Sequence, residues 1–466
     1  MNLMKVDYPL TADAIHYAWR QLLVRAGMDD ETAPVTLCYG EVSTPNSPRV
    51  VVRPCAPQAW GELLSRPPGT LRWIPVEETI PVGARLPFKD PVPVLFWGKE
   101  RDESDVPFAK MDSNLNVVFN ADIIAATVFM LSRWEEMVVP VCDEHDRFPA
   151  SASVAYKQSF LDRPVVDEYA MILRAWLLAL FPCWQPARRK FSVKVTYDVD
   201  HVFPFQSMQN AMRACVGDIL KRRRPAQAWD NLKDAFWQSL VPERNSYLQA
   251  VYALAALSTR NGLDSAFYFM SAKPSLFDSG YDPELPWVKA CIQELLKQGV
   301  EIGFHPGYYT LDDPGLFAVE KQRLDDVVGH TKYGGRQHFL RFRVPDTWLL
   351  WESAGLTYDS TMVYPDHEGF RCGTCHPFQP YDLRTDRLLD LWEQPPIVMD
   401  GTLRDYRSLT PAAGEHRILE LARRCRDVEG TFILIWHNTS LSKGWVEWGA
   451  MYQRVIEKLT IGLFPN

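Results

Sequence analysis

The sequence has no run of about 18 apolar residues, the shortest length that a membrane-spanning helix normally requires. Its N-terminus, MNLMKVDYPL, carries Asp7 and Pro9 where a signal peptide needs an apolar core. The net charge is −8, so there is no basic excess to support a nucleic-acid partner. We therefore expect a cytoplasmic protein without a transmembrane segment and without a nucleic-acid partner.

The cysteine pattern gives no sign of a disulfide framework. The nine cysteines are scattered and odd in number, which fits a reducing compartment. Cys372 and Cys375 have CxxC spacing, but no second such pair exists to complete a structural zinc site. We interpret both as core or loop cysteines.

The 466 residues, 47% of them apolar, are enough for two or more folded domains. In the first part of the chain, periodicity predicts helices over residues 11–26, 122–137 and 167–181 and short strands near 50–52, 92–97 and 117–120. The segment 182–190 contains two prolines and a change of charge, which is typical of a boundary. We predict a smaller N-terminal α/β accessory domain over residues 1–185, of unknown role, and a second domain over residues 190–466.

One charged cluster in the first part allows two interpretations. Arg133, Glu135 and Glu136 either line a groove or form a solvated helix face. Charge clusters usually face water, so we favour the solvated face.

Strands and helices alternate in the second part of the chain. We expect strands over residues 191–196, 265–270, 300–304 and 431–436, and helices over 246–261, 286–298, 316–331, 347–354 and 446–459. This alternation predicts parallel strands joined by crossover helices. Residues 337–344 are expected to be extended.

An insertion-like stretch, residues 202–244, interrupts this pattern and contains the basic run 221–224. We interpret the run as a solvated helix end, and the alternative is that it binds an anionic lipid or substrate.

Acidic and imidazole side chains occur just past three of the expected strands. Asp198 and Asp200 are two apart, so in extended backbone they point to the same side. His305 follows the strand at 300–304, and His437 follows the strand at 431–436. The carboxyl ends of parallel strands are where α/β enzymes place their chemistry.

The residue types indicate a metal site with an acid–base pair. Asp200 and His305 are ligand types that bind zinc or a similar ion, and His437 suits a general acid or base. The alternatives are a turn capped by the two aspartates and buried structural histidines. Arg336 and His338 lie on the same side if their segment is extended.

Four segments resemble motifs of the polysaccharide deacetylase family, carbohydrate esterase family 4, over about residues 191–464. They are residues 196–200 (TYDVD), 303–305 (GFH), 336–341 (RQHFLR) and 434–437 (LIWH). The resemblance implies a distorted (β/α) barrel with fewer than eight strands. It also implies that Asp198 is the general base, that Asp200 and His305 bind a divalent metal, with zinc as the first choice, and that His437 is the general acid.

The sequence departs from the family pattern at Tyr309, where the second motif normally has another metal-binding histidine. His338 or His201 could replace that ligand. We expect Tyr309 and the arginines Arg336, Arg341 and Arg371 to bind the substrate, since guanidinium groups pair with the carboxylates of acidic sugars. Residues 132–136 are also similar to a region that precedes such domains in a bacterial subgroup.

The resemblance implies a deacetylase that removes N-acetyl groups from an acetamido sugar. With no secretion signal expected, the substrate would be a bacterial surface polysaccharide or its lipid-linked precursor, such as O-antigen or capsule. A catalytically impaired glycan-binding protein, favoured by Tyr309, and a glycosyltransferase that uses the Asp-x-Asp pair are the alternatives. Four aromatic residues are candidates for stacking on sugar rings, although we expect most of them in the core: Trp348, Tyr364, Trp392 and Trp436.

Overall fold

The computed structural model of the protein describes residues 10–29, 33–40, 49–98, 106–205 and 207–460. The N-terminal segment with Asp7 and Pro9 lies outside these ranges. Within them, no helix combines the length and the apolar character needed to cross a bilayer.

A parallel five-stranded sheet forms the centre of the second part of the chain. Its strands lie in the order β14 (Val398–Met399), β15 (Thr431–His437), β7 (Ser192–Val199), β8 (Asp264–Met270) and β9 (Glu301–His305). The strands are rich in apolar residues, as expected for a sheet covered on both faces. The predicted α/β fold with parallel strands is confirmed.

The sheet continues beyond β9 through isolated bridges. Gly335 pairs with Phe304 on one side and with Asp359 on the other. This leads to the short parallel pair β10 (Tyr358–Asp359) and β13 (Trp392–Glu393). Among the described residues no pairing joins β13 to β14, so the strands do not close into a barrel.

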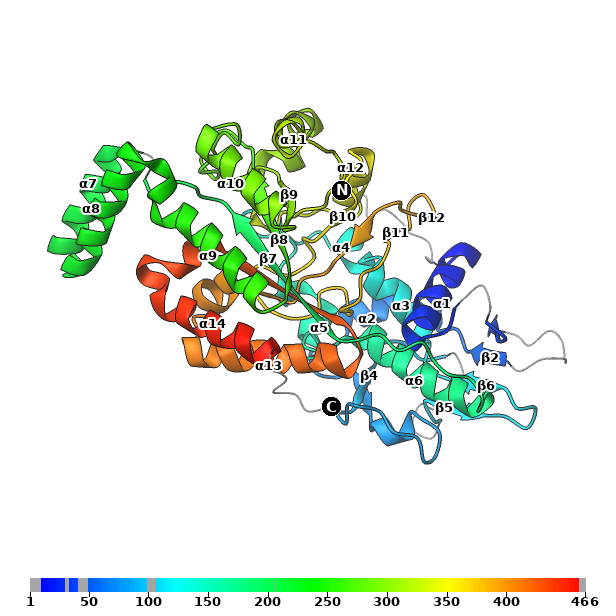
Figure 1. The fold of residues 1–466 in the computed structure, drawn as a ribbon. Helices are drawn as coiled ribbons and strands as arrows, with labels where there is room; N and C mark the ends of the chain where they lie inside the picture. Colours follow the sequence, from blue (N-terminus) through cyan, green and yellow to red (C-terminus); the bar gives the residue numbers. More distant parts are fainter. Residues whose placement is uncertain (1–9, 30–32, 41–48, 99–105, 206, 461–466) are drawn as a thin grey trace.

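Helices cover both sides of this sheet (Figure 1). They are α9 (Ser246–Arg260), α10 (Pro286–Lys297), α11 (Pro314–Val328), α12 (Asp346–Ser353), α13 (Pro411–Asp427) and α14 (Val446–Thr460). Side chains that precede the helices satisfy their first N–H groups: Asn245 caps α9, Asp313 caps α11 and Thr410 caps α13. Helix α13 was not predicted from the sequence.

The first part of the chain has a sheet in the order β1 (Thr36–Tyr39), β2 (Arg49–Val52), β6 (Val117–Phe119) and β5 (Ala109–Met111), and an antiparallel pair, β3 (Arg72–Ile74) and β4 (Val92–Val94). Its α-helices are α1 (Ala12–Ala26), α2 (Ala59–Ser65), α3 (Ile123–Leu131), α4 (Trp134–Val138), α5 (Val154–Lys157) and α6 (Val165–Leu180). The single helix predicted over residues 122–137 is broken at Arg133, whose φ of 54° is left-handed.

The left-handed turn directs a charged cluster inward. Arg133 and Glu135 are buried, with a nitrogen–oxygen distance of 2.7 Å, and Arg133 also contacts Glu136 at 2.9 Å. The interpretation of these residues as a solvated helix face is therefore wrong. They form an internal ion-pair cluster.

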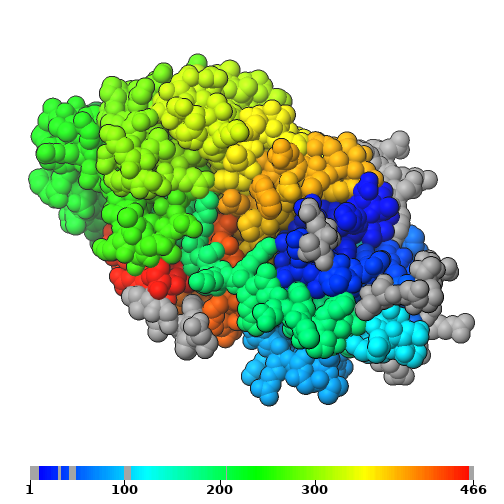
Figure 2. Space-filling model, turned by 45° about the vertical axis from the view of Figure 1, so that its right-hand side comes forward, coloured from blue at the N-terminus to red at the C-terminus, as the bar shows by residue number. Residues whose placement is uncertain are grey.

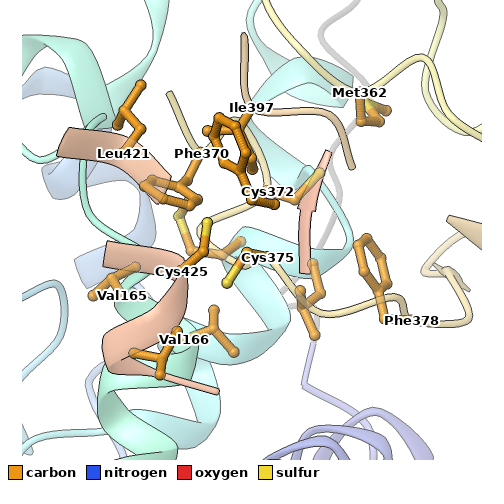
Figure 3. Packing of buried hydrophobic residues seen from close by; sticks show 14 of the residues in the cluster. Val165, Val166, Met362, Phe370, Cys372, Cys375, Phe378, Ile397, Leu421 and Cys425 are labelled. Atoms are coloured by element: carbon orange, nitrogen blue, oxygen red, sulfur yellow. The ribbon is translucent and has the colours of Figure 1, made fainter. Parts of the chain in front are cut away.

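One continuous apolar cluster contains residues from both parts of the chain, from Ala14 to Leu459. Figure 3 shows part of it, where Val165 of α6 lies near Phe370, Cys375 and Cys425. Cys372 and Cys375 are buried, in agreement with their interpretation as core cysteines. Residues 182–190 contain no helix or strand, and the two-domain boundary placed there stays a prediction.

The insertion after β7 is a helical hairpin of α7 (Met208–Leu220) and α8 (Pro225–Leu240). It projects from the body of the molecule, at the left of Figure 1 and of the space-filling view in Figure 2.

Candidate active site and metal centre

The parallel strands bring the acidic and imidazole residues to one edge of the sheet. His437, the last residue of β15, pairs in register with Asp198 of β7. Asp200 directly follows β7, and His305 is the last residue of β9. The nitrogen Nε2 of His437 lies 4.0 Å from Asp198 and 3.6 Å from Asp200, so the distant segments converge as predicted.

His338 reaches the same place from a turn and not from a strand. Residues 337–344 were expected to be extended, but His338–Leu340 forms a 3-10 turn in which Phe339 has a φ of 59°. The turn directs the His338 ring toward Asp200, with Nε2 3.9 Å from Oδ1.

Asp200, His305 and His338 place one potential ligand atom each within 4.8 Å of one another. The Nδ1 atoms of both histidines face hydrogen-bond acceptors. Nδ1 of His305 lies 2.6 Å from the Arg336 carbonyl, and Nδ1 of His338 lies 2.8 Å from Asp278. Protons on these two Nδ1 atoms leave both Nε2 lone pairs free. This is how metal-binding histidines are oriented in proteins.

Two of the atoms that converge here face each other and form no hydrogen bond of good geometry. Oδ1 of Asp200 and Nε2 of His305 are buried and lie 3.0 Å apart as an ion-pair contact, and no other hydrogen bond to either atom is found among the described residues. Buried polar atoms are nearly always partnered. One oxygen and two imidazole nitrogens are the donor set of three-ligand catalytic zinc sites, so these residues fit a divalent cation.

The charges of the group match such a site. Burial opposes ionisation of Asp200, but contact with His305 and the fields of His338 and His437 hold its pKa well below the usual value. Burial opposes protonation of His305, but Asp198 and Asp200 raise its pKa, so the two carboxylates favour positive charge at Nε2, and a bound cation would replace the proton there. Asp200 is therefore an anion that attracts positive charge to this point.

Asp198 is held by Arg336. One guanidinium nitrogen of Arg336 lies 2.5 Å from Oδ1 of Asp198, and the others donate to Thr196 and to the carbonyl of Ser360. The guanidinium is fully buried. Its prediction as a substrate-binding residue is therefore corrected: it orients Asp198.

His437 is held in the same way by Asp400, which follows β14. Nδ1 of His437 lies 2.6 Å from Asp400, and the backbone N–H of His437 donates to the same carboxylate. Burial opposes the charged ring, but the negative charge of Asp400 raises the pKa of His437 to about 10. The sequence analysis missed Asp400, although IVMD repeats the pattern of an acid after an apolar run. Asp278 was also not predicted, because it lies in a loop where no sequence pattern marks a functional residue.

Three other predicted substrate-binding residues lie elsewhere. Arg341 is buried and donates to the carbonyls of Tyr308 and His145. Arg371 is buried and its guanidinium forms two bonds to Glu136. Both arginines are occupied by protein partners, which contradicts a direct role in binding an acidic sugar. Tyr309 is 44% exposed and does not line the site cavity.

A cavity of about 160 Å³ opens onto the group. It is lined by Arg147, Asp198, Asp200, His305, Gln337, His338, Phe339, Leu340, Met399, Tyr406 and His437. Arg147 belongs to the first part of the chain and donates to the Tyr406 hydroxyl and the Phe339 carbonyl. The N-terminal region therefore contributes to the wall, which the sequence analysis did not predict.

The four aromatic residues considered for sugar stacking do not line this cavity. Trp348, Tyr364 and Trp436 are fully buried, as expected for core residues, and Trp392 is half exposed on β13. The aromatic side chains at the cavity are Phe339 and Tyr406.

A family model described as a family of unknown function (DUF7033) matches residues 75–182. No curated protein matches the sequence. Among solved structures, the chain is similar to a candidate polysaccharide deacetylase from Mycobacterium smegmatis, with 18% identity, a TM-score of 0.38, and coverage of 59% of this chain and 86% of the other. It is also similar to PuuE allantoinase, with 12% identity, a TM-score of 0.35 and the same coverage.

Proposed function

We propose that this protein is a metal-dependent deacetylase that removes N-acetyl groups from an acetamido sugar of a bacterial surface polysaccharide or of its lipid-linked precursor. The observation that carries the proposal is the convergence of ligand atoms from Asp200, His305 and His338 at a cavity that also contains Asp198 and His437. Oδ1 of Asp200 and Nε2 of His305 are buried there and form no hydrogen bond of good geometry. The choice of an acetylated sugar rests on the motif resemblance over residues 191–464.

Asp200, His305 and His338 would hold the cation. A divalent cation at this point supplies a Lewis acid for the acyl carbonyl, which is the chemistry that amide hydrolysis requires. Asp278 and the Arg336 carbonyl would fix the two imidazole rings, since both accept from Nδ1. Tyr309 then has no place among the ligands, because His338 provides the second imidazole.

Asp198 is the group that takes a proton from the attacking water. Arg336 binds its Oδ1 and keeps the carboxylate in one orientation. The other oxygen, Oδ2, lies on the side of His437 and of the cavity. A base positioned in this way typically accelerates a reaction by about 10²–10⁴-fold.

His437 is the group that gives a proton to the departing amine. Asp400 holds Nδ1, so the proton to be donated is on Nε2, which faces the two aspartates. Asp400 raises the pKa of His437 to about 10, so without a bound cation the ring holds this proton at neutral pH. The site therefore contains one base and one acid on opposite members of the strand pair β7 and β15.

The size of the cavity limits what part of the substrate it encloses. Its volume of about 160 Å³ is below the range of about 300–1,000 Å³ that encloses a whole small-molecule ligand. An acyl group and part of one sugar ring fit this space. Phe339 and Tyr406 offer aromatic faces at its wall, and the rest of a glycan would remain outside.

The two alternatives from the sequence make different use of these residues. A glycosyltransferase would bind a nucleotide-sugar through the Asp-x-Asp pair and would leave His305 and His437 without roles. A catalytically impaired glycan-binding protein needs no cation at Asp200. Metal titration, nucleotide-sugar titration and hydrolysis assays therefore separate the three.

The test is acetate release from N-acetylglucosamine oligomers by protein that has been stripped with a chelator and then reloaded with zinc. We expect release only after reloading, with about one zinc bound per chain. Stoichiometric zinc binding without acetate release from these oligomers, or with release from O-acetylated glycans alone, would overturn the proposed N-deacetylase. Absence of zinc, cobalt and manganese binding would overturn the metal site.

A further inference from the structure

The hairpin formed by α7 and α8 is held together by small and polar side chains. The buried residues include Ala211 and Asp218 of α7, and Ala228, Asn231 and Ala235 of α8. The Asn231 amide donates to Asp218 at 2.6 Å, so the seam between the helices contains a polar bond. A helix pair in water normally places its apolar residues in such a seam.

The large apolar side chains of this hairpin lie outside the seam. Nine of the 22 exposed large hydrophobic side chains among the described residues belong to these two helices. Each is between 51% and 73% exposed: Met208, Met212, Val216, Ile219, Leu220, Trp229, Leu232, Phe236 and Leu240.

These side chains lie on one face of the hairpin. In both helices an exposed apolar residue directly follows a seam residue: Met212 follows Ala211, Ile219 follows Asp218, Trp229 follows Ala228, Leu232 follows Asn231 and Phe236 follows Ala235. Each step of one residue along an α-helix rotates the side-chain direction by about 100°, and the sense of this rotation along the chain is the same in both helices. Because the two helices run antiparallel, the same rotation places both apolar arcs on the same side.

The connection between the helices is strongly basic. Residues 221–224, KRRR, are all exposed. Residues 208–240 carry six lysines or arginines and three aspartates, a net charge of +3 in a chain of net charge −8. A helix of this length extends about 20 Å, more than the Debye length of about 8 Å at physiological salt, so the tip is screened from the acidic body.

We propose that the hairpin binds the surface of an anionic lipid bilayer. The apolar face enters the region between headgroups and acyl chains, and the basic connection contacts the anionic headgroups. Exposed Trp, Phe and Leu beside Lys and Arg are the features of helices that lie in this interface. Helices of 13 and 16 residues are too short to span the bilayer, so the contact is peripheral.

The hairpin is attached beside the proposed active site. Only the residues 201–207 separate Asp200 from α7. Hydrogen bonds hold the attached end of the hairpin. The Gln238 side chain of α8 bonds to the backbone of Phe205, in the segment that leads into α7. The side chain of Asn245, which caps α9, donates to the Val202 carbonyl in the same segment. A docked hairpin would hold the site next to the membrane. This inference deepens the proposed function, because it selects the lipid-linked precursor as the substrate.

The test is flotation of the full chain with vesicles of phosphatidylcholine alone or with about 30% phosphatidylglycerol. We expect binding to the anionic vesicles that weakens as salt is raised. Trp229→Ser/Phe236→Ser and Arg223→Glu/Arg224→Glu should each lower the partition coefficient by about tenfold or more. The matched controls are Val24→Ser/Val319→Ser and Lys297→Glu/Lys332→Glu, which change exposed residues elsewhere and should bind as the wild type does.

Three outcomes would overturn the inference: no binding of the wild type to anionic vesicles, equal binding by the hairpin variants, or a solution dimer that Trp229→Ser/Phe236→Ser dissociates in sedimentation velocity. The last would assign the apolar face to a second copy of the chain. Vesicle binding needs no catalysis, so it stands or falls independently of the deacetylase. Hydrolysis of a short water-soluble glycan should be unchanged in all four variants.

Discussion

Within the described part of the chain, two groups of side chains bring three potential metal-ligand atoms within 4.8 Å of one another. One is Asp200, His305 and His338, and the other is Asp167, Cys375 and His376. All of these residues are buried except Asp200, whose side chain is 17% exposed, and both groups contain a carboxylate and a histidine. They differ in what their donor atoms already bind.

In the second group every ligand atom has a partner from the protein. Oδ1 of Asp167 accepts from Arg25 at 3.0 Å and from Thr374 at 2.6 Å, and Oδ2 accepts from the backbone N–H of Cys375 at 2.8 Å. Both ring nitrogens of His376 also have partners. Burial raises the pKa of Cys375 well above its usual value, so it lacks the thiolate that binds metal.

In the first group the donor atoms face one another at a cavity. Oδ1 of Asp200 and Nε2 of His305 lie 3.0 Å apart without a hydrogen bond of good geometry among the described residues, and both residues line the cavity. Proximity of ligand types therefore does not by itself define a metal site. Donor atoms that the protein leaves unused, next to a space that substrate can enter, distinguish it from a polar cluster that stabilises the fold.

The largest effect is expected for Asp200→Asn. The substitution keeps the shape of the side chain but removes the only anion among the three ligands, so zinc affinity should fall by more than about 100-fold and activity should be lost. Zinc content after dialysis and competition with a fluorescent chelator measure the change. Zinc affinity equal to that of the wild type would remove Asp200 from the site.

Asp198→Asn should separate catalysis from metal binding. An amide cannot take the proton of the attacking water, so turnover should fall by about 10²–10⁴-fold. Zinc affinity should stay within a few-fold of the wild type, because Asp198 is not among the three ligands. Acetate release under saturating zinc measures the first quantity and chelator competition the second. A large loss of zinc instead would make Asp198 a ligand.

Asp278→Asn tests the support of His338. Without the carboxylate at Nδ1, the ring is less firmly oriented and less basic, and zinc affinity should fall by about 10–100-fold. Asp282→Asn, an exposed change in the same loop, is the matched control. If both variants bind zinc equally, His338 is not held by Asp278 in the metal-bound protein.

The sequence predicted the part of the site that depends on strand ends. Asp198, Asp200 and His437 follow apolar runs that form neighbouring parallel strands, so their convergence follows from the register of the sheet. His305 ends another of these strands. The same reasoning predicted most helices of the second part, because their periodicity is strong.

The features that the sequence missed depend on backbone turns and on contacts between distant segments. The left-handed residues Arg133 and Phe339 turn side chains inward against the pattern of a regular helix or strand. Arg336 was predicted to bind substrate because its type suits a carboxylate, but the carboxylate that it binds is Asp198. The contribution of Arg147 requires the first part of the chain to pack against the second, and no local pattern encodes that contact.

Asp167→Asn is the counterpart of Asp200→Asn and should have the smallest effect on the site. Loss of the charge weakens the bond from Arg25 and leaves a buried guanidinium poorly partnered, which should lower the free energy of unfolding by about 1–3 kcal/mol. Zinc affinity should be unchanged, because this group does not need a cation to complete its bonds. Thermal unfolding and chelator competition measure the two effects. A loss of bound zinc in Asp167→Asn, with zinc retained in Asp200→Asn, would exchange the roles of the two groups.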